Sequence, residues 1–291
     1  MQNPCANPFT NPTASIADKR RTFHALHQSG CFVLPNPWDI GSARYLQSLG
    51  FKALASTSSG FAWTRGHPDN GITREMAIAH LAELVAATDL PVNADFESGF
   101  ATSSAELAIS VGLAVEAGVA GLSIEDSTGD AAHPLFSVDE ATERMRAARR
   151  AIDAAGGDTL LVGRAECFLF GRPDLEETIA RLKAYAQAGA DCLYAPGIRT
   201  REQIAAVVAA VSPKPVNLLV GWASDLTVAA LAELGVRRIS TGGALARTAW
   251  GGVMRAATAL ADGRFDGLAD AASGRVLNEL FAADQMRRTT G

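Results

Sequence analysis

The segment PVNADFESGF, residues 91–100, decides how the rest of the chain is interpreted. Its apolar start after a proline predicts a short buried strand, and a glycine turn follows. Two carboxylates, Asp95 and Glu97, stand two residues apart at the end of that strand. If the extended geometry continues to Glu97, both side chains point the same way, and their charges repel unless a proton or a cation lies between them. A solvated strand end explains the same residues, so further evidence has to come from the surrounding sequence.

Similar short apolar runs recur along the chain, and helical periodicity follows each of them. Strands are predicted at residues 31–35, 51–57, 91–95, 119–125, 159–164, 191–196, 215–220 and 237–241. Helices are predicted at residues 20–29, 39–49, 73–87, 103–117, 138–155, 174–188, 201–211, 225–234 and 244–261. Eight strand-helix units in roughly 250 residues have the size and rhythm of a (β/α)₈ TIM barrel.

A doubly wound α/β sheet also alternates strands and helices, but it usually carries a glycine-rich turn after its first strand. Here that turn reads NPWD, residues 36–39, without glycine, so the barrel is favoured. We expect a flexible N-terminal arm at residues 1–18, a catalytic barrel at residues 19–262 and a C-terminal helical extension at residues 263–291. Apolar residues of the extension predict a helix that needs a partner surface: Val276, Leu277, Leu280 and Phe281.

The composition limits the classes of partner. Of the 291 residues, 48% are hydrophobic and 20% are charged, which is typical of a globular protein with a large core. The net charge of −5 and the lack of a basic stripe argue against nucleic-acid binding. Four arginines at helical spacing are expected to form a solvated helix face: Arg144, Arg146, Arg149 and Arg150. No apolar run approaches the length of a membrane span.

The cysteines and the N-terminal residues indicate a cytoplasmic location. Four scattered cysteines, without CxxC spacing, suggest reduced thiols and give no zinc signature: Cys5, Cys31, Cys167 and Cys192. The first 18 residues lack the basic start and apolar stretch of a secretion signal.

Polar residues collect where the predicted strands end, and in a barrel these ends form the catalytic face. They comprise STSSG at 56–60 and Asp69 after the second strand, Asp95 and Glu97 after the third, Glu125 and Asp126 after the fourth, Arg164 and Glu166 after the fifth, Asn217 in the seventh, and Thr241, Gly242 and Gly243 after the eighth. Each alone has a structural explanation as a turn, a helix cap or an ion pair. Together they place several carboxylates, one arginine and a loop rich in N–H donors at one rim.

This set of groups has a consistent chemical meaning. Carboxylates can hold a hard divalent cation, and an arginine opposite them can grip a small acid. N–H groups of Ser58, Ser59 and Gly60 can bind a carboxylate or a developing oxyanion. A 2-oxo or 2-hydroxy acid fits, because its carboxylate and neighbouring oxygen chelate a metal together.

Several segments resemble the isocitrate lyase / phosphoenolpyruvate mutase superfamily: FKAL at 51–54, the serine-glycine loop with Asp69 behind it, DFESGF at 95–100, GVAGLSIED at 118–126 and AQAGAD at 186–191. The resemblance runs from about residue 23 to 260. It implies a (β/α)₈ barrel whose eighth helix is exchanged between subunits, usually in a homotetramer built as a dimer of dimers. It also implies Mg²⁺ or Mn²⁺ and the breaking or forming of C–C or P–C bonds in small 2-oxo acids through an enolate.

The resemblance assigns roles by position. Asp95 is implied as the direct metal ligand, with Asp69, Glu97 and Glu125 contacting the ion largely through water. Substrate binding is implied for Thr57, Ser58, Ser59 and Gly60, for Asn217, and for the strand-eight turn at Thr241 and Gly242. Arg164 matches the arginine that clamps the substrate, and Arg164, Glu125 and His133 are the candidate catalytic residues.

The loop after strand four departs from the family pattern. Isocitrate and methylisocitrate lyases carry a Lys-Lys-Cys-Gly-His type segment there, and the mutase carries a lysine and an Asn-Ser pair. This chain has STGDAAHPLF at 127–136, without cysteine or lysine. His133 is the only imidazole on this loop and a candidate general acid or base, although a loop histidine next to a proline is more often simply exposed. Cys167 lies close to Arg164 in sequence but is expected to be a packed residue.

Three functional hypotheses remain open from the sequence. The favoured one is a Mg²⁺-dependent lyase, decarboxylase or C–C hydrolase that acts on a small 2-oxo or 2-hydroxy dicarboxylate and is not a classical isocitrate lyase. The second is a phosphonate enzyme that holds phosphate or phosphonate at the Thr241-Gly242-Gly243 turn. The third is a non-catalytic barrel that binds a metabolite.

Overall fold

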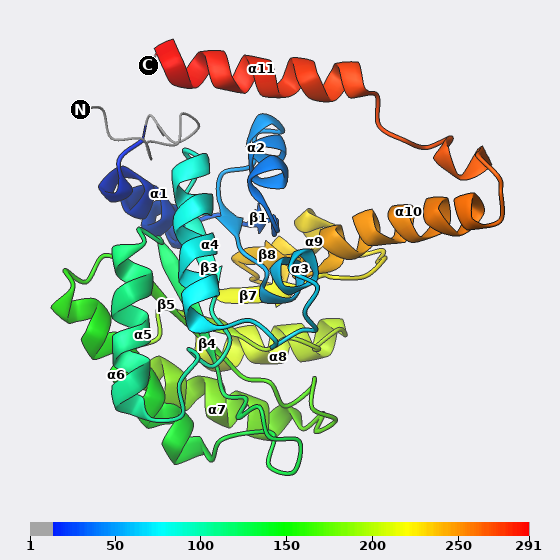
Figure 1. Cartoon of the computed structure of the whole chain (residues 1–291). Helices are drawn as coiled ribbons and strands as arrows, with labels where there is room; N and C mark the ends of the chain where they lie inside the picture. Colours follow the sequence, from blue (N-terminus) through cyan, green and yellow to red (C-terminus); the bar gives the residue numbers. More distant parts are fainter. Residues whose placement is uncertain (1–13, 291) are drawn as a thin grey trace.

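The computed structural model describes residues 14–290 and confirms the barrel (Figure 1). Eight strands form one sheet: β1 (Phe32–Leu34), β2 (Leu54–Ala55), β3 (Val92–Asp95), β4 (Gly121–Glu125), β5 (Leu160–Arg164), β6 (Cys192–Tyr194), β7 (Val216–Leu219) and β8 (Arg238–Ser240). Their order is β1-β8-β7-β6-β5-β4-β3-β2, and every paired neighbour is parallel. Between β1 and β2, the Ala55 N–H donates to the Pro35 carbonyl at 3.1 Å, which nearly closes the cylinder.

All eight predicted strands are present, and helices follow them around the outside. The helices are α1 (Ile16–Gln28), α2 (Ile40–Ser48), α3 (Ser58–Thr64), α4 (Arg74–Ala87), α5 (Ser104–Glu116), α6 (Val138–Ala154), α7 (Leu175–Gln187), α8 (Arg201–Val211), α9 (Val228–Glu233), α10 (Ala244–Ala261) and α11 (Gly274–Thr290), with a short 3₁₀ turn η1 (Asp266–Leu268). The prediction missed α3, because STSSG suggests a turn and not the start of a helix. Of the predicted arm, residues 1–13 lie outside the described residues, and α1 begins at Ile16. The division into domains stays a prediction.

Side-chain caps define where most helices begin. Ser103 and Ser137 cap α5 and α6 in reciprocal capping boxes with Glu106 and Glu140, which satisfy the free N–H groups of each first turn. Gly163 lets α7 approach β5 closely, since a Cβ atom there would lie 2.8 Å from the Tyr185 Cβ. These contacts fix the strand ends, which carry the site.

The interior of the barrel is unusually polar. Barrels of this kind are normally filled by branched apolar side chains. Here the strands place eight polar or charged side chains along one cavity: Asn93, Asp95, Ser123, Arg164, Tyr194, Asn217, Arg238 and Ser240. The apolar core lies instead between the sheet and the helices, around residues such as Leu107, Ile124 and Leu182. The inside of the barrel therefore forms a polar cavity and not an apolar core.

One predicted surface feature is wrong. Arg144 of α6 does not belong to a solvated face, because only 3% of its surface is exposed. Its guanidinium donates to the carbonyls of Ala101 and Thr102, at 2.9 and 3.1 Å, and to that of Ser98, and it lies 4.4 Å from the centre of the Phe136 ring. Arg144 therefore holds the loop after β3 against the loop after β4. Helical spacing alone did not show this, because the loop after β3 that accepts its hydrogen bonds lies more than 40 residues away in the sequence.

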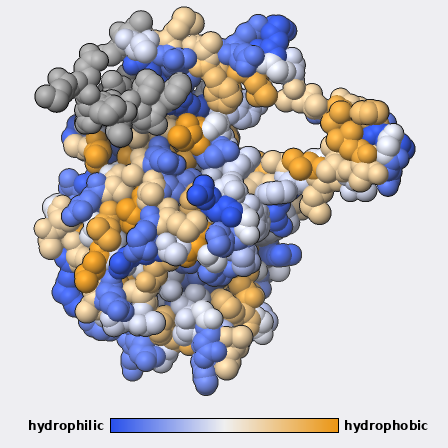
Figure 2. All heavy atoms as spheres, viewed as in Figure 1, coloured by the Kyte–Doolittle hydropathy of each residue, from blue (hydrophilic) through white to orange (hydrophobic). Residues whose placement is uncertain are grey.

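The C-terminal helices leave the body of the barrel. In Figure 1, α10 extends away from β8, and α11 returns across α2. Only Ala246 and Ala259 of α10 are buried, whereas Trp250, Val253 and Met254 are exposed. Figure 2 shows hydrophobic side chains at the far end of this arm, where Phe265 is 76% exposed. Within residues 14–290, no helix is both long and apolar enough to cross a lipid bilayer.

His27 on α1 reaches the lower part of the barrel. Its Nε2 lies 3.3 Å from Nη1 of Arg238, and its Nδ1 lies 2.7 Å from the Phe23 carbonyl. Arginine can only donate, so Nε2 accepts and the Nδ1 proton is donated to Phe23. Burial, helped by the positive charge of Arg238, lowers the pKa of His27 to about 3.

This pKa predicts how stability depends on pH. The pKa of His27 is lower in the folded chain than in the unfolded chain, so its contribution is complete above about pH 6.5 and is lost as the pH falls toward about 3, by up to about 1.4 kcal/mol per pH unit. Urea unfolding between about pH 7 and about pH 4 should therefore show a shallower pH dependence for His27→Gln than for the wild type. Equal slopes in the two proteins would contradict the burial of a neutral His27.

Candidate functional site

A cavity of about 130 Å³ opens at the carboxyl ends of the strands. Its walls come from all eight strands or the segments just after them, and from the loop that carries Asp69. The lining residues are Asn36, Ala55, Thr57, Ser58, Ser59, Asp69, Asn93, Asp95, Ser123, Arg164, Tyr194, Asn217, Leu219, Arg238, Ser240, Gly242 and Gly243. Its size and polar walls suit an organic acid of a few carbon atoms.

Asp95 stands at the end of β3 and is held from two sides. Its own N–H donates to the Ser56 hydroxyl at 2.8 Å, while its Oδ2 accepts from both the N–H and the hydroxyl of Ser58, each at 3.0 Å. Ser58 begins α3, and Thr57 caps that helix by accepting from the Gly60 N–H at 3.2 Å. The segment expected to be an open anion-binding loop is therefore a helical turn directed at Asp95. Of the N–H groups of Ser58, Ser59 and Gly60, only that of Ser59 has no hydrogen-bond partner among the described residues.

Arg164 at the end of β5 is the centre of the charge cluster. Its Nη1 lies 2.9 Å from Asp95 Oδ1 and 3.2 Å from Glu125 Oε2, and its Nε donates to Glu166. Its guanidinium also lies 5.1 Å from the ring centre of Tyr194. Burial acts to lower the pKa of Arg164, but the charges of Glu166 and Glu125 outweigh it and raise the pKa well above its usual value. One cation thus faces three carboxylates.

Burial raises the pKa values of the neighbouring acids, so they lose their protons less readily. It raises the pKa of Glu125, although Arg164 and a 2.7 Å hydrogen bond from the Ser127 hydroxyl oppose the rise. It raises the pKa of Glu166 to about 8, again against the effect of Arg164. Asp69 lies on the loop above the cavity, where desolvation and the charge of Asp95 raise its pKa. The cluster therefore carries more acidic groups than its single arginine neutralises.

Glu97 does not share the face of Asp95, as an unbroken strand would require. β3 ends at Asp95, and Glu97 adopts a left-handed conformation with φ of 49°, which turns its side chain toward a neighbouring cavity of about 610 Å³. Its Oε1 is buried without a hydrogen-bond partner among the described residues. Burial, and then the charge of Asp95, raise the pKa of Glu97 to about 8. The two carboxylates are therefore coupled electrostatically, but they belong to different cavities.

The turn after β8 is already occupied by a side chain. Oδ1 of Asn36 accepts from the N–H groups of Thr241 and Gly242, both at 2.9 Å. The Asn36 amide donates in turn to the Ser56 carbonyl at 2.7 Å. An anion could use these two N–H groups only by displacing Asn36. The predicted phosphate-binding turn is thus closed by an internal hydrogen-bond network.

Asn217 and Arg238 form the lower wall of the cavity. Oδ1 of Asn217 accepts from Nε of Arg238 at 2.9 Å, and its amide nitrogen donates to the Ser240 hydroxyl at 2.9 Å. Nη1 of Arg238 donates to Asn93 Oδ1 at 3.2 Å. The predicted site residue Asn217 therefore lies in the cavity wall, but its polar atoms are engaged with neighbouring side chains.

His133 is not brought to the cavity. It lies at the tip of the loop after β4, with 85% of its side chain exposed and Nδ1 3.3 Å from Asp130 Oδ2. The loop itself is a small hairpin, in which Ser127 pairs with Leu135 and the Thr128 N–H donates to the Pro134 carbonyl at 3.0 Å. Cys167 is fully buried, as expected for a packing residue.

Asp126 is a structural anchor beneath the site and not part of it. Its Oδ1 accepts from the Glu166 N–H at 2.8 Å, and its Oδ2 accepts from Tyr185 at 2.6 Å and from Arg181 at 3.0 Å. Arg181 also donates to the Phe136 carbonyl at 2.9 Å. Asp126 therefore ties the segment after β5 to α7 and to the end of the β4 loop, which fixes the position of Glu166 next to Arg164.

The acids suit a hydrated hard cation more than a closed protein cage. Among the described residues, no group of three or more His, Cys, Asp or Glu side chains is placed to hold a metal ion by itself. Mg²⁺ commonly takes only one or two carboxylates and completes its shell with water and substrate oxygens. The surplus of carboxylates around Arg164 fits such an ion, with Asp95 as the ligand on the cavity wall.

The sequence predicted most of the residues at the rim of the cavity but not those deeper inside it. Asn36, Asn93, Tyr194 and Arg238 line the cavity but were not predicted as site residues. The signal for Asn93 was present, since it precedes Asp95 by two residues and therefore shares its face of the strand. Tyr194 and Arg238 had the same kind of signal, because each is a polar residue inside a strand.

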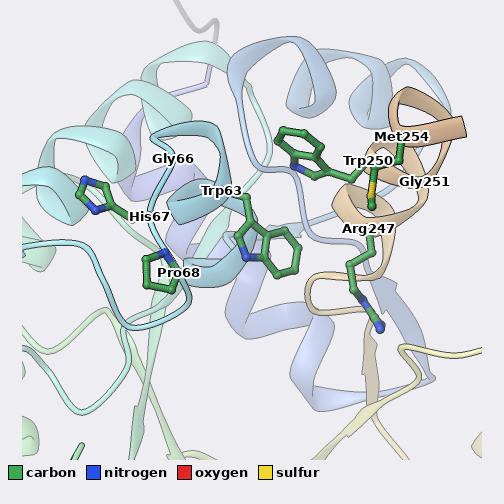
Figure 3. A pocket seen from close by; sticks show the side chains of 8 residues that line it. All are labelled: Trp63, Gly66, His67, Pro68, Arg247, Trp250, Gly251 and Met254. Carbon is green, nitrogen blue, oxygen red and sulfur yellow. The ribbon is translucent and has the colours of Figure 1, made fainter. Parts of the chain in front are cut away.

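A second, more apolar cavity lies beside the site. Figure 3 shows it between the end of α3 and the first half of α10. It measures about 550 Å³ and is lined by Trp63, Gly66, His67, Pro68, Arg247, Trp250, Gly251 and Met254. No carboxylate lines it, so it lacks the groups that the proposed chemistry requires.

Fold and site together define a class of protein: a (β/α)₈ enzyme barrel with an acidic, arginine-containing cavity at the catalytic face. The chain belongs to the phosphoenolpyruvate phosphomutase family, whose model matches residues 23–261, and so to the phosphoenolpyruvate mutase / isocitrate lyase superfamily. Members of this superfamily are carbon-carbon lyases and mutases, and this chain is an enzyme of that lyase-like type. Superfamily members depend on Mg²⁺ and act on small acids.

Three similar proteins illustrate the range. A Burkholderia cenocepacia protein assigned as a lyase or mutase has a structure that is 48% identical in sequence, with a TM-score of 0.89, covering 92% of this chain and 97% of its own. Oxaloacetate decarboxylase of Pseudomonas savastanoi pv. phaseolicola is 30% identical, covering 78% of this chain and 79% of its own. The structure of an oxaloacetate acetylhydrolase with its product oxalate is 26% identical in sequence, with a TM-score of 0.82, covering 97% of this chain and 100% of its own.

Removal of the Asp126 carboxylate should destabilise the fold. Asp126→Ala removes the acceptor of the buried Tyr185 hydroxyl and one of the two carboxylates that pair with Arg181, and we expect a loss of about 3–5 kcal/mol in the free energy of unfolding by urea. Glu143→Ala is the control, because Glu143 pairs with Arg150 on an exposed face and should change stability by less than about 1 kcal/mol. Similar losses in the two variants would contradict the anchoring role of Asp126.

Proposed function

We propose that this protein is a Mg²⁺-dependent enzyme that cleaves a C–C bond in a small 2-oxo or 2-hydroxy carboxylate through an enolate. The observation that carries the proposal is the cluster at Arg164, where one mostly buried guanidinium meets Asp95, Glu125 and Glu166. Asp95 and Arg164 of this cluster line a cavity of about 130 Å³. Acids that outnumber the local cation are stabilised by a proton or by a bound cation. The oxaloacetate enzymes among the similar proteins support C–C chemistry on such acids.

Asp95 would hold the ion directly, while Asp69, Glu97 and Glu125 would contact it through water. When bound, Mg²⁺ supplies Lewis acidity that stabilises the negative charge developing on the substrate oxygen. The protein's own groups would bind and orient the substrate. Arg164 would donate to a substrate carboxylate from Nη2, because its Nη1 and Nε already contact Asp95, Glu125 and Glu166. The Ser59 N–H, which has no partner among the described residues, would offer another donor on the same wall.

In the cleavage step the protein has to orient the substrate and to transfer a proton. In a 2-oxo acid such as oxaloacetate, the C–C bond to the far carboxylate breaks and that group leaves as CO₂. The electron pair remains on the carbon next to the oxo carbon and is delocalised onto the oxo oxygen. A proton must then reach that carbon. Glu125, whose pKa is raised by burial, is suited to keep and return a proton within the site, and the Tyr194 hydroxyl is a second donor on the wall.

The P–C alternative has less support. The turn at Thr241 and Gly242, which was the predicted phosphate site, donates its N–H groups to Asn36. The loop after β4 also lacks the lysine and the Asn-Ser pair of the mutase. C–C cleavage therefore remains the favoured activity. We also keep the expectation that the protein works in the cytoplasm.

The helix that leaves the barrel supports an oligomer. We propose that α10 exchanges with a second copy, within a homotetramer, because Trp250, Val253 and Met254 are exposed along it at 44–64%. Burial of such side chains against a partner is favourable. Light scattering should give the mass of an oligomer for the wild type and a lower mass for Val253→Asp, and a monomeric wild type would refute the exchange.

Loss of the Asp95 carboxylate should abolish turnover. With oxaloacetate and Mg²⁺, we expect Asp95→Ala to reduce kcat/KM by on the order of 1,000-fold or more, because the ion loses its direct ligand. Treatment of the wild type with EDTA should have the same effect, and added Mg²⁺ should reverse it. The control is Glu143→Gln, which removes an acid far from the cavity on the exposed face of α6.

Two outcomes would overturn the assignment. Wild-type turnover by Asp95→Ala would remove Asp95 from the site. A wild type without EDTA-sensitive turnover of oxaloacetate or of methylisocitrate would favour a barrel that only binds a metabolite.

A further inference from the structure

The cleavage of a C–C bond to an enolate needs a proton donor, and few groups on the cavity wall can act as one. Among the described residues, no lysine, cysteine, histidine or glutamate lines the cavity. Arg164 and Arg238 cannot give up a proton, because arginine stays charged in proteins. Asp69 and Asp95 belong to the proposed ion site, and serine and threonine hydroxyls are much weaker acids than a phenol. The elimination leaves the hydroxyl of Tyr194.

The other candidate donors do not line the cavity. His133 lies at the tip of the loop after β4, with 85% of its side chain exposed. Glu125 is not one of the lining residues, and its carboxylate is engaged by Arg164 at 3.2 Å and by the Ser127 hydroxyl at 2.7 Å. Glu125 can therefore hold a proton near the site, but the last donor to the substrate has to be a group on the wall itself.

Tyr194 ends β6 and lies beside Arg164. The two residues are register partners across β5 and β6, and the guanidinium carbon lies 5.1 Å from the centre of the tyrosine ring. Tyr194 lines the cavity although only 7% of its surface is exposed. A substrate whose carboxylate lies at Arg164 and the ion would therefore share a space of about 130 Å³ with this side chain.

The surroundings of Tyr194 keep it protonated and can also stabilise its anion. Burial raises the pKa of Tyr194 to about 12, although the charge of Arg164 and a hydrogen bond with the Ser240 hydroxyl oppose the rise. The oxygen of Ser240 accepts from the Asn217 amide at 2.9 Å, which leaves the Ser240 proton for Tyr194. Tyr194 thus carries its proton at neutral pH, and two neighbours favour the anion that forms when the proton leaves.

We propose that Tyr194 is the catalytic acid that protonates the carbon atom of the enolate. The inference rests on the proposed function, which supplies the enolate. In this step the O–H bond of Tyr194 breaks, the electron pair of the enolate forms the new C–H bond, and the enolate oxygen becomes the carbonyl oxygen of the product. A phenol is a stronger acid than a C–H group next to a carbonyl, so the transfer favours the product. The tyrosinate regains a proton from water when the product leaves.

The conversion of enolpyruvate to pyruvate tests this step without C–C cleavage. A phosphatase releases the enol from phosphoenolpyruvate, and the loss of its ultraviolet absorbance reports its conversion. With Mg²⁺ present, the wild type should accelerate the conversion above the rate in buffer. Tyr194→Phe keeps the ring but not the proton, and we expect it to reduce the acceleration by about 100-fold or more, as for loss of a general acid.

Tyr45→Phe is the matched control, since Tyr45 is 49% exposed on α2 and does not line the cavity, and it should keep the wild-type rate. Because CO₂ release from oxaloacetate precedes protonation, Tyr194→Phe should lose far less of this release than of the enol conversion. Equal losses of both, an unchanged enol conversion in Tyr194→Phe, or no acceleration by the wild type would overturn the proposal. Tyr194-dependent conversion in a protein that does not cleave oxaloacetate would refute the proposed function and support the role of Tyr194.

A second measurement needs no variant. The enol with one further methyl group, supplied as a single geometric isomer in D₂O, gains one deuterium as it becomes 2-oxobutanoate. A fixed donor on one wall reaches one face of the enol, so the wild type should give one configuration at the labelled carbon. Reduction by a stereospecific dehydrogenase followed by proton NMR determines this configuration. An equal mixture of the two configurations would overturn the proposal, even if Tyr194→Phe did not fold.

Discussion

The balance of charge around Arg164 is the constraint on which the rest of the structure depends. A guanidinium with 15% of its side chain exposed needs anionic partners, and the ends of β3, β4 and β5 supply Asp95, Glu125 and Glu166. These acids exceed what one arginine neutralises, and burial raises the pKa values of Glu125 and Glu166 in response. The site is thus prepared for a cation and for an anionic ligand that together complete its charges.

The fold maintains this arrangement with groups that take no part in the chemistry. Asp126 holds the segment after β5 through the Glu166 N–H, and Ser56 and Ser58 hold Asp95 in place. Arg144 fixes the loop after β3 from outside the barrel. Each of these contacts joins segments far apart in the sequence, so the rim depends on the closed cylinder.

The sequence predicted the barrel because every strand-helix unit repeats the same local pattern, and local patterns need no knowledge of distant contacts. Asp95 and Arg164 were predictable because they end strands, and strand ends meet at one rim. The orientation of Glu97 could not be predicted, since it depends on the left-handed conformation of this residue after the end of β3. The engagement of the Thr241 and Gly242 amides was not predictable either, because their partner, Asn36, is about 200 residues away in the sequence.

The most direct test of this account is a crystal of the protein soaked with Mn²⁺ and oxalate, in which anomalous scattering locates the metal. The account predicts one ion within coordination distance of Asp95, with oxalate between the ion and Arg164. An ion bound elsewhere, or no ion in a cavity that holds oxalate, would contradict it.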